Sequence, residues 1–281
     1  YETDHHEFTV TPDIQDLLPK LVWHYNEPFA DSSAVPTWYL AQMTRKHVTV
    51  ALNGDGSDEC FAGYIRYADT RTAAMFQKIA SCAGLPLLQR ALDLVPESKQ
   101  QHSFLERLRR FVRLLCSDAP HWHMRYISQF NTTEKARLYT KPFRETVENI
   151  DSADLTAALY AAADGSACVD KLLFAEVMSY LPEDLLVKVD IASMAHSLEA
   201  RSPFLDHRVM EFAAALPPKL KFNGRETKYF LKQILADFVP AEILSREKMG
   251  FGVPIDRWLR HELREMTRDL LLDKTATGRG Y

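Results

Sequence analysis

The sequence lacks any run of about 18 consecutive apolar residues, the length that a membrane-spanning helix needs. Its first residues, "YETDHHEF", have neither the basic start nor the apolar stretch of a secretory signal peptide. An excess of basic residues is missing too, since 34 Lys and Arg face 38 Asp and Glu, for a formal net charge of −4. We therefore expect neither a membrane nor a nucleic acid as a partner.

Cysteine is scarce, and the four cysteines are far apart and form no C-x-x-C pair. They are Cys60, Cys82, Cys116 and Cys168. Four isolated cysteines are too few for a disulfide scaffold in a chain of 281 residues. The pattern predicts a reducing, cytoplasmic setting.

Three common site motifs are also missing: G-x-x-x-x-G-K-[ST], G-x-G-x-x-G and H-E-x-x-H. The first two cradle phosphates in nucleotide-binding proteins, and the third binds zinc. If this chain binds a nucleotide, another kind of loop must hold the phosphates.

The chain is 46% apolar, enough for one large core or two modest ones. Residues 7–10 and 47–52 are predicted to be strands, and residues 13–25 between them a helix that Pro19 should kink or split. Apolar residues recur at helical spacing in residues 103–116, 231–238 and 259–270. The order predicts an α/β fold, in which a partial parallel sheet with a crossover connection precedes a large, mainly α-helical region.

The segment "VTVALNGDGSDECFAGY", residues 48–64, ends a β-rich run in clustered glycines and acids. Gly54 and Gly56 permit a close approach of a ligand to the backbone, and Asp55, Asp58 and Glu59 crowd three carboxylates into five residues. A hard cation such as Mg²⁺ would relieve their repulsion. The pattern fits equally a solvated acidic turn.

In that alternative, the side chain of Ser57 or Asp58 would cap the following helix.

A second polar segment is "YLPEDLLVKVDIASMAHSLEARSPFLDHR", residues 180–208. Read as one helix, it places Lys188 and Glu199 nearly on one face, which is typical of a helix that lines a wet or charged space. The alternative is an interior helix in which Lys188, Asp190, Glu199 and Arg201 pair with one another.

A third segment, "SREKMGFGVPIDRWL", residues 245–259, places Lys248 on a loop with Gly250 and Gly252 before Asp256 opens a helix. A lysine on a glycine loop is suited to close over phosphate or a developing negative charge. A merely solvated lysine has the same pattern.

Together and in this order, these segments resemble the synthetase domain of glutamine-dependent asparagine synthetases. The matching stretches are "TDHHEFTV", "LPKLVWHYNEPFADSSAVPTWYLA", "VTVALNGDGSDECFAGYIRY", "LPEDLLVKVDIASMAHSLEARSPFLDHRVMEFAAALP" and "REKMGFGVPIDRWL". They span most of the chain, apart from a helical middle at about residues 68–177. The resemblance implies an ATP-pyrophosphatase-type, Rossmann-like sheet within the α/β fold.

The resemblance also implies a chemistry. ATP adenylates the side-chain carboxylate of aspartate, and ammonia from a glutaminase domain of the same full-length chain displaces AMP to give asparagine. ATP and Mg²⁺ are the implied cofactors, and a homodimer stays open. Relatives that amidate or cyclise another carboxylate, in surface polysaccharides, β-lactams or peptides, are the alternative, as is a non-catalytic fragment.

Residue roles follow from the resemblance alone. Asp58 matches the aspartate that holds Mg²⁺ at the pyrophosphate, Asp55 is a candidate acceptor of a proton from the attacking amine, and Lys248 matches a lysine that contacts phosphate and the intermediate. Gly54 and Gly56 would lie against substrate and nucleotide. The remaining candidates support the substrate pocket or the ammonia tunnel: Ser57, Glu59, Glu199 and Arg201.

The sequence also departs from the family pattern. The pyrophosphate loop and the glutaminase domain of the family are expected before Tyr1, and further helices after Gly280, so we expect a synthetase domain truncated at both ends. Such a chain alone should neither bind ATP tightly nor make AMP. Asn53 stands where serine is usual, which removes no charged group.

Overall fold

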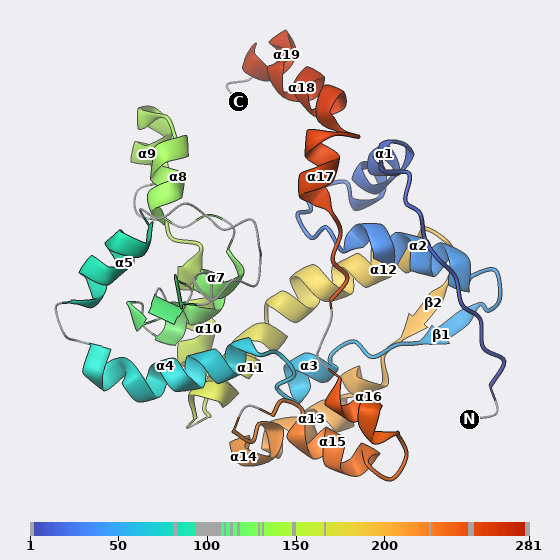
Figure 1. Ribbon diagram of the computed structural model, residues 1–281, viewed down its shortest axis with the longest axis vertical. Helices are drawn as coiled ribbons and strands as arrows, with labels where there is room; N and C mark the ends of the chain where they lie inside the picture. Colours follow the sequence, from blue (N-terminus) through green and yellow to red (C-terminus); the bar gives the residue numbers. More distant parts are fainter. Residues whose placement is uncertain are drawn as a thin grey trace. The chain divides into compact units, whose positions relative to one another are not determined.

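The computed structural model describes residues 3–80, 84–93, 108–109, 111–112, 115–116, 119–128, 130, 132–147, 150–165, 167–224, 226–246 and 250–278 (Figure 1). The chain divides into two compact units, which we call unit 1 and unit 2. Unit 1 consists of Tyr1–Gly54, Glu183–Pro203 and Ser245–Tyr281, and unit 2 consists of Asp55–Pro182 and Phe204–Leu244.

Unit 1 contains a small parallel sheet and several helices. Strand β1 (Val50–Leu52) pairs with β2 (Glu199–Arg201), with Val50 opposite Glu199 and Leu52 opposite Arg201 (Figure 1). The helices are α1 (Ile14–Tyr25), α2 (Ala34–Thr44), α12 (Val187–Met194), α17 (Ile255–Arg260), α18 (Arg264–Leu272) and α19 (Lys274–Gly278).

A core of aliphatic and aromatic side chains joins α1, α2, α12, α17 and α18. Leu17 and Leu21 of α1, Trp38 of α2 and Trp258 of α17 are all buried in it. Pro19 lies inside α1 and does not split it, so of the predicted kink or split the split is excluded; Leu17 and Leu21 hold the helix to this core on either side of Pro19. Asp13 caps the helix by accepting a hydrogen bond from the backbone N–H of Asp16 at 3.1 Å.

Two of the strand and helix predictions are wrong. Residues 7–10 form no strand, and the parallel partner of β1 comes instead from residues 199–201, which the sequence placed inside a helix. The helical stretch ends before β2 because Ser197 takes a left-handed conformation, with φ of 56°. The backbone N–H of Glu199 then donates to the carbonyl of Thr49 at 2.9 Å, which begins the ladder.

Unit 2 is helical in the part that the structure describes. Its elements include α3 (Ser57–Cys60), α4 (Arg66–Ala80), α5 (Leu85–Asp93), η1 (Ala119–His121), α7 (Trp122–Ile127), α8 (Thr132–Leu138), α9 (Lys141–Val147), α10 (Ala153–Ala162), α11 (Cys168–Val177), α13 (His207–Ala215), α14 (Pro218–Lys221) and α15 (Tyr229–Leu235). The helix predicted for residues 231–238 is confirmed by α15 up to Leu235. Much of the helix predicted for residues 103–116 lies outside the described residues.

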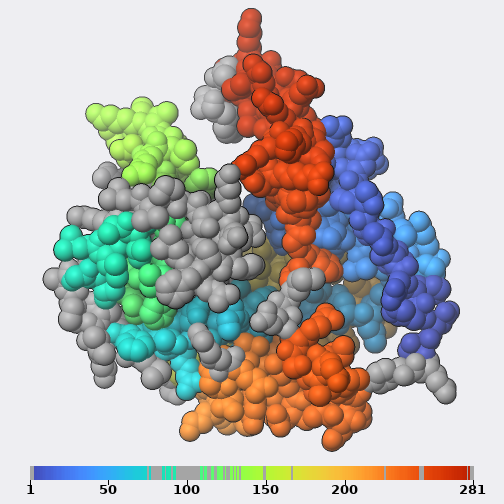
Figure 2. Space-filling model, viewed as in Figure 1, coloured from blue at the N-terminus to red at the C-terminus, as the bar shows by residue number. Residues whose placement is uncertain are grey.

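Three elements cross the division between the units along the chain. They are the π-helix η2 (Leu181–Leu186), the short 3-10 helix η3 (Pro203–Leu205) and α16 (Ala241–Ser245). In Figure 2 the surface of α13 to α16 is the orange region.

The core of unit 2 forms where α4 and α11 meet. Tyr67 and Ala68 of α4 pack with Leu172 and Leu173 of α11 and with Phe222, which follows α14. A smaller cluster buries Trp122 completely. The fold is thus mostly helical with a small parallel sheet, as the α/β prediction requires at the coarse level. No helix among the described residues combines the length and the apolar character needed to cross a membrane.

Candidate functional site

The acidic segment begins where the parallel pair of strands ends, in unit 1. The backbone N–H of Asn53 donates to the carbonyl of Arg201 at 2.9 Å, and the Ser202 hydroxyl donates to the side-chain oxygen of Asn53. Asn53 therefore ties together the chain segments that leave β1 and β2. Parallel sheets bind ligands beyond the carboxyl ends of their strands, and "NGDGSDE" follows that edge directly.

The two glycines of the segment differ in what they require. Gly56 has φ of +84°, and a Cβ there would lie 2.2 Å from Cδ2 of Leu205, so glycine is needed for the fold itself. A Cβ on Gly54 would meet nothing within 4 Å. Gly54 is exposed, and its open backbone is accessible to a ligand.

The three carboxylates of the segment lie in three different environments. Asp58 forms an ion pair with the Lys228 ammonium at 2.9 Å, and Lys228 also donates to the Ser57 hydroxyl at 2.9 Å. Glu59 is 1% exposed and accepts a hydrogen bond from the Tyr64 hydroxyl. Asp55 is half-buried.

These environments reduce the repulsion that the sequence suggests. Burial raises the pKa of Glu59 above its usual value, against the opposing effect of the Tyr64 hydrogen bond, and Lys228 supplies a positive charge to Asp58. The N-cap of α3 is Gly56 and has no side-chain cap bond, so Ser57 and Asp58 do not act as caps. The capping alternative is therefore wrong.

Gly63 keeps the surroundings of Asp58 open, a feature that the sequence reasoning missed. A Cβ on Gly63 would lie 1.8 Å from Oδ1 of Asp58 and 2.4 Å from Cε of Lys228. The backbone N–H of Gly63 donates to the Asp58 carbonyl at 2.8 Å. Any larger residue would displace the Asp58–Lys228 pair. The signal in the sequence is the glycine five residues after Asp58, in "DECFAG".

The side chains present suit a metal ion that is held mainly by the phosphates of a bound substrate. Among the described residues, no group of three or more His, Cys, Asp or Glu side chains is arranged to hold a metal. Mg²⁺ is usually bound by one or two carboxylates together with substrate phosphates and water. Asp58 can supply one such carboxylate, and the fit to Mg²⁺ therefore depends on phosphate oxygens.

A second polar cluster lies in unit 1 around Lys188 of α12. The Lys188 ammonium donates to Asp31 at 2.6 Å and to the Ser33 hydroxyl at 2.8 Å, and Ser33 donates to Asp31 through both its backbone N–H and its hydroxyl. The Tyr25 hydroxyl donates to the Lys188 carbonyl at 3.1 Å. Burial of Asp31 opposes its ionisation, but the Lys188 and Ser33 bonds together lower its pKa.

This cluster corrects the interpretation of residues 180–208. Lys188 does not share a helix face with Glu199, because β2 begins at Glu199, and its partner is Asp31 rather than a residue of its own segment. Glu199 pairs with Arg201 at 2.6 Å, and both side chains are more than half exposed. The sequence signal for the missed partners was the run "ADSSA" before α2.

A buried network in unit 2 joins α4 to α11. Arg66 donates to both carboxylate oxygens of Glu176, at 2.8 and 2.7 Å, and the Tyr67 hydroxyl donates to the same carboxylate. The guanidinium of Arg66 also lies 3.7 Å from the ring centre of Tyr64 and 5.2 Å from that of Tyr180. This pair is enclosed by aromatic rings and supports the fold.

The third predicted segment is only partly described. Lys248 lies outside the described residues, so its prediction stays untested. Gly250 and Gly252 lie in a segment without regular structure. Asp256 falls in the first turn of α17, which confirms the predicted start of a helix there.

Comparison with known proteins gives one consistent relationship. The asparagine synthase family model matches residues 1–281. The chain is 34% identical over 254 residues to the glutamine-hydrolyzing asparagine synthetase 1 of Bacillus subtilis, which covers 90% of this chain and 38% of that protein. It is 35% identical over 247 residues to a putative glutamine-hydrolyzing asparagine synthetase of Mycobacterium bovis, covering 86% of this chain and 35% of that protein.

A more distant relative is the amidase chyE of Penicillium rubens, 24% identical over 283 residues, with 92% of this chain and 40% of that protein covered. No solved structure matches. The chain belongs to the asparagine synthase family. It spans 38% and 35% of the length of the two synthetases named above.

Proposed function

We propose that this chain is the ligase part of a glutamine-hydrolysing asparagine synthetase. The observation that carries the proposal is the match of the asparagine synthase family to residues 1–281, supported by relatives that bear that name. In the proposed reaction the side-chain carboxylate of aspartate attacks ATP to form an acyl-adenylate and pyrophosphate. Ammonia from glutamine then displaces AMP, giving asparagine.

The chemistry explains why this reaction needs side chains of both signs of charge. A carboxylate is a poor electrophile for ammonia until one of its oxygens becomes part of a good leaving group. Negative charge develops on pyrophosphate and on the tetrahedral intermediate, and fixed positive groups lower its energy. We assign Lys248 to this role. Asp55, half-buried after β1, would accept a proton from the attacking amine.

The phosphates would approach the open backbone of Gly54 at the carboxyl end of β1. Bound Mg²⁺ would neutralise phosphate charge, and Asp58 would be its protein ligand. Lys228, bonded to both Ser57 and Asp58, holds that carboxylate in place. Gly56 serves this arrangement indirectly, through the turn that its positive φ permits.

The roles of Glu59, Glu199 and Arg201 follow their environments. Glu59 is buried against Tyr64 and would support the position of Asp58, its neighbour in α3. Glu199 and Arg201 are exposed and paired, so a contact with substrate would require them to exchange partners. Cys60 and Cys168 have free thiols, as in the reducing, cytoplasmic setting that we propose.

The test measures AMP, pyrophosphate and asparagine formation by the protein expressed from its complete coding sequence. With aspartate, ATP, Mg²⁺ and either ammonia or glutamine, we expect AMP release that depends on aspartate. A panel of other carboxylates serves as the comparison. Pyrophosphate release that follows another acid, and not aspartate, would assign the chain to a related amidating enzyme.

Removal of Lys248 gives the largest expected effect on this reaction. Lys248→Ala should lower the rate of asparagine formation by orders of magnitude and leave glutamine hydrolysis measurable, because the lysine serves only the charged intermediate. Lys141→Ala, which removes an exposed lysine of α9, is the matched control and should leave the rate unchanged. An unchanged asparagine yield in Lys248→Ala would show that the lysine has no catalytic role.

A further inference from the structure

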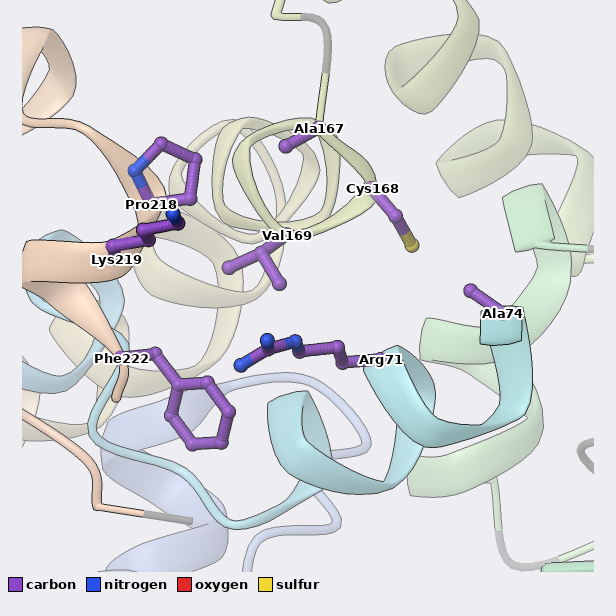
Figure 3. Close-up of a pocket in the computed structure, with 8 residues that line it drawn as sticks. All are labelled: Arg71, Ala74, Ala167, Cys168, Val169, Pro218, Lys219 and Phe222. Atoms are coloured by element: carbon purple, nitrogen blue, oxygen red, sulfur yellow. The ribbon is translucent and has the colours of Figure 1, made fainter. Parts of the chain in front are cut away.

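A pocket of about 330 Å³ opens in unit 2 between α4, α11 and α14 (Figure 3). Its walls include Arg71 of α4, Cys168 and Val169 at the start of α11, and Pro218, Lys219 and Phe222 of the α14 region. None of these residues belongs to the candidate site described above. Protein pockets that bind small molecules commonly have volumes of about 300 to 1,000 Å³. The volume of this pocket therefore suits a compact ligand.

The inner wall of the pocket is apolar and firmly held. Val169 and Phe222 are 6% and 2% exposed and belong to the packed core of unit 2. Figure 3 shows the side chain of Arg71 extending from α4 toward Phe222, with Val169 across from its guanidinium. The thiol of Cys168 points toward Ala74 on the other side of the pocket.

Both charged residues that line the pocket are cations. Arg71 and Lys219 are exposed, and the guanidinium of Arg71 lies 5.8 Å from the ring centre of Phe222. Neither has a carboxylate partner among the described residues. Asp170, the acid nearest in sequence on α11, already pairs with Lys221 at 3.0 Å. The pocket therefore combines unpaired positive charge with an apolar wall.

We propose that this pocket binds a small carboxylate with a compact apolar body, with the carboxylate on Arg71 and the body against the apolar wall that includes Val169 and Phe222. The guanidinium fork matches a carboxylate through two parallel hydrogen bonds, and Lys219 adds a second positive charge. A volume of about 330 Å³ has room for an aromatic or branched acid of about ten non-hydrogen atoms.

Binding at this pocket is non-covalent. Burial raises the pKa of the Cys168 thiol, with a hydrogen bond to Tyr160 and the Lys171 charge opposing this. The thiol therefore stays protonated at neutral pH and is a poor nucleophile. Its contribution is to the apolar wall.

The experiment uses the protein from its complete coding sequence and phenylacetate as the probe. Affinity is measured by isothermal titration calorimetry at millimolar ligand concentration, against acetate, phenylacetamide and inorganic phosphate. We expect phenylacetate to bind, acetate and phosphate to bind more weakly because they lack the apolar body, and phenylacetamide more weakly because it lacks the charge. Absence of phenylacetate binding, or equal binding of phosphate, would overturn the proposal.

Substitutions of residues inside and outside the pocket test where phenylacetate binds. Arg71→Gln should weaken phenylacetate binding about tenfold or more, as expected for loss of hydrogen bonds to a charged group. Lys219→Gln should have a smaller effect. Arg137→Gln, which removes an exposed arginine of α8, is the matched control and should bind as the unmodified protein does. Equal affinity in Arg71→Gln and Arg137→Gln would refute the assignment to this pocket.

If Arg71→Gln fails to fold, as judged by circular dichroism, Arg71→Lys replaces it. That variant keeps the charge and loses the fork, so the proposal requires weaker phenylacetate binding in it too.

Discussion

Two ion pairs, one in each unit, bring together segments more than a hundred residues apart and differ in their access to water. In unit 1, Lys188 and Asp31 are 10% and 22% exposed and share their hydrogen bonds with Ser33. In unit 2, Arg66 and Glu176 are 10% and 1% exposed and are surrounded by tyrosine rings. Burial thus distinguishes a pair that can still exchange partners with solvent or a ligand from one that is committed to the fold.

Individual residues in the two units also differ in the direction of their pKa shifts. In unit 1 the pKa of Asp31 and that of His196 are both lowered, whereas in unit 2 the pKa of Glu59 is raised. A lowered pKa costs stability on acidification, and a raised carboxylate pKa costs stability on alkalinisation. Asp31 and Glu59 should therefore contribute to the pH dependence of stability in opposite senses.

Glu176→Ala should give the largest loss of stability. It leaves the Arg66 guanidinium buried without its carboxylate, and we expect a loss of about 3–5 kcal/mol in the free energy of unfolding. Urea denaturation measures it. Glu211→Ala on α13, an exposed glutamate, is the control and should change stability by less than about 0.5 kcal/mol. Equal effects would mean that the buried pair contributes no more than a surface charge.

Lys188→Met should cost less, about 1–3 kcal/mol at pH 7, because Asp31 stays partly hydrated. The pair's contribution is fully present above the unfolded pKa of Asp31, near 3.8, and is lost as pH falls through the lowered folded value. Urea titrations at neutral and acidic pH should therefore show the difference from the unmodified protein shrinking in acid. A double variant with Asp31→Asn should recover part of the loss. A constant difference across pH would contradict this account.

Glu59→Gln tests the opposite sign in unit 2. The raised folded pKa means that stability is fully present below the unfolded value, near 4.5, and declines as pH rises through the folded value. Gln keeps an acceptor for the Tyr64 hydroxyl and cannot ionise. We expect it to flatten this decline above the unfolded value. Thermal unfolding across pH measures the slope, and an unaltered slope would be incompatible with a raised pKa of Glu59.

His196→Asn should give the smallest effect. The imidazole of His196 packs edge-on against Trp38, with ring centres 4.6 Å apart, and His24 lies 4.9 Å from Trp38. Burial, followed by repulsion from His24, lowers the pKa of His196. Stability should therefore fall as pH drops from about 6.5 through the folded value, and the variant should lose part of that slope. His24→Asn is the companion variant, expected to raise the pKa of His196 measured by NMR titration.

Local signals predicted the helices better than the strands. The helix predicted for residues 13–25 is α1, and Asp256 marked the start of α17, because helical periodicity and the first turn of a helix depend on a few neighbouring residues. The segment at Glu199–Arg201 had no such signal. A three-residue strand exists only because β1 offers its backbone, and such a partner 149 positions away cannot be read from local pattern.

The candidate site also has features that the local sequence predicted and features that depend on distant residues. The glycines and acids of residues 53–59 were recognisable as a turn beyond a strand, and the structure has that turn after β1. The ion-pair partners of the charged side chains were not predictable. They are Lys228 for Asp58, Asp31 for Lys188 and Glu176 for Arg66. Pairing between distant segments depends on tertiary packing, which neither the composition of the sequence nor the spacing of its residues reveals.

The register of β1 with β2 continues beyond the strands at a constant offset. Val50 faces Glu199, Asn53 bonds Ser202, and Gly56 makes room for Leu205, each pair 149 positions apart. The connection between these two stretches can gain or lose residues without disturbing that alignment. An insertion or deletion of one residue inside either stretch would misalign every later pair at once. Across related genes, length changes should therefore accumulate in the connection and be excluded from residues 50–56 and 199–205.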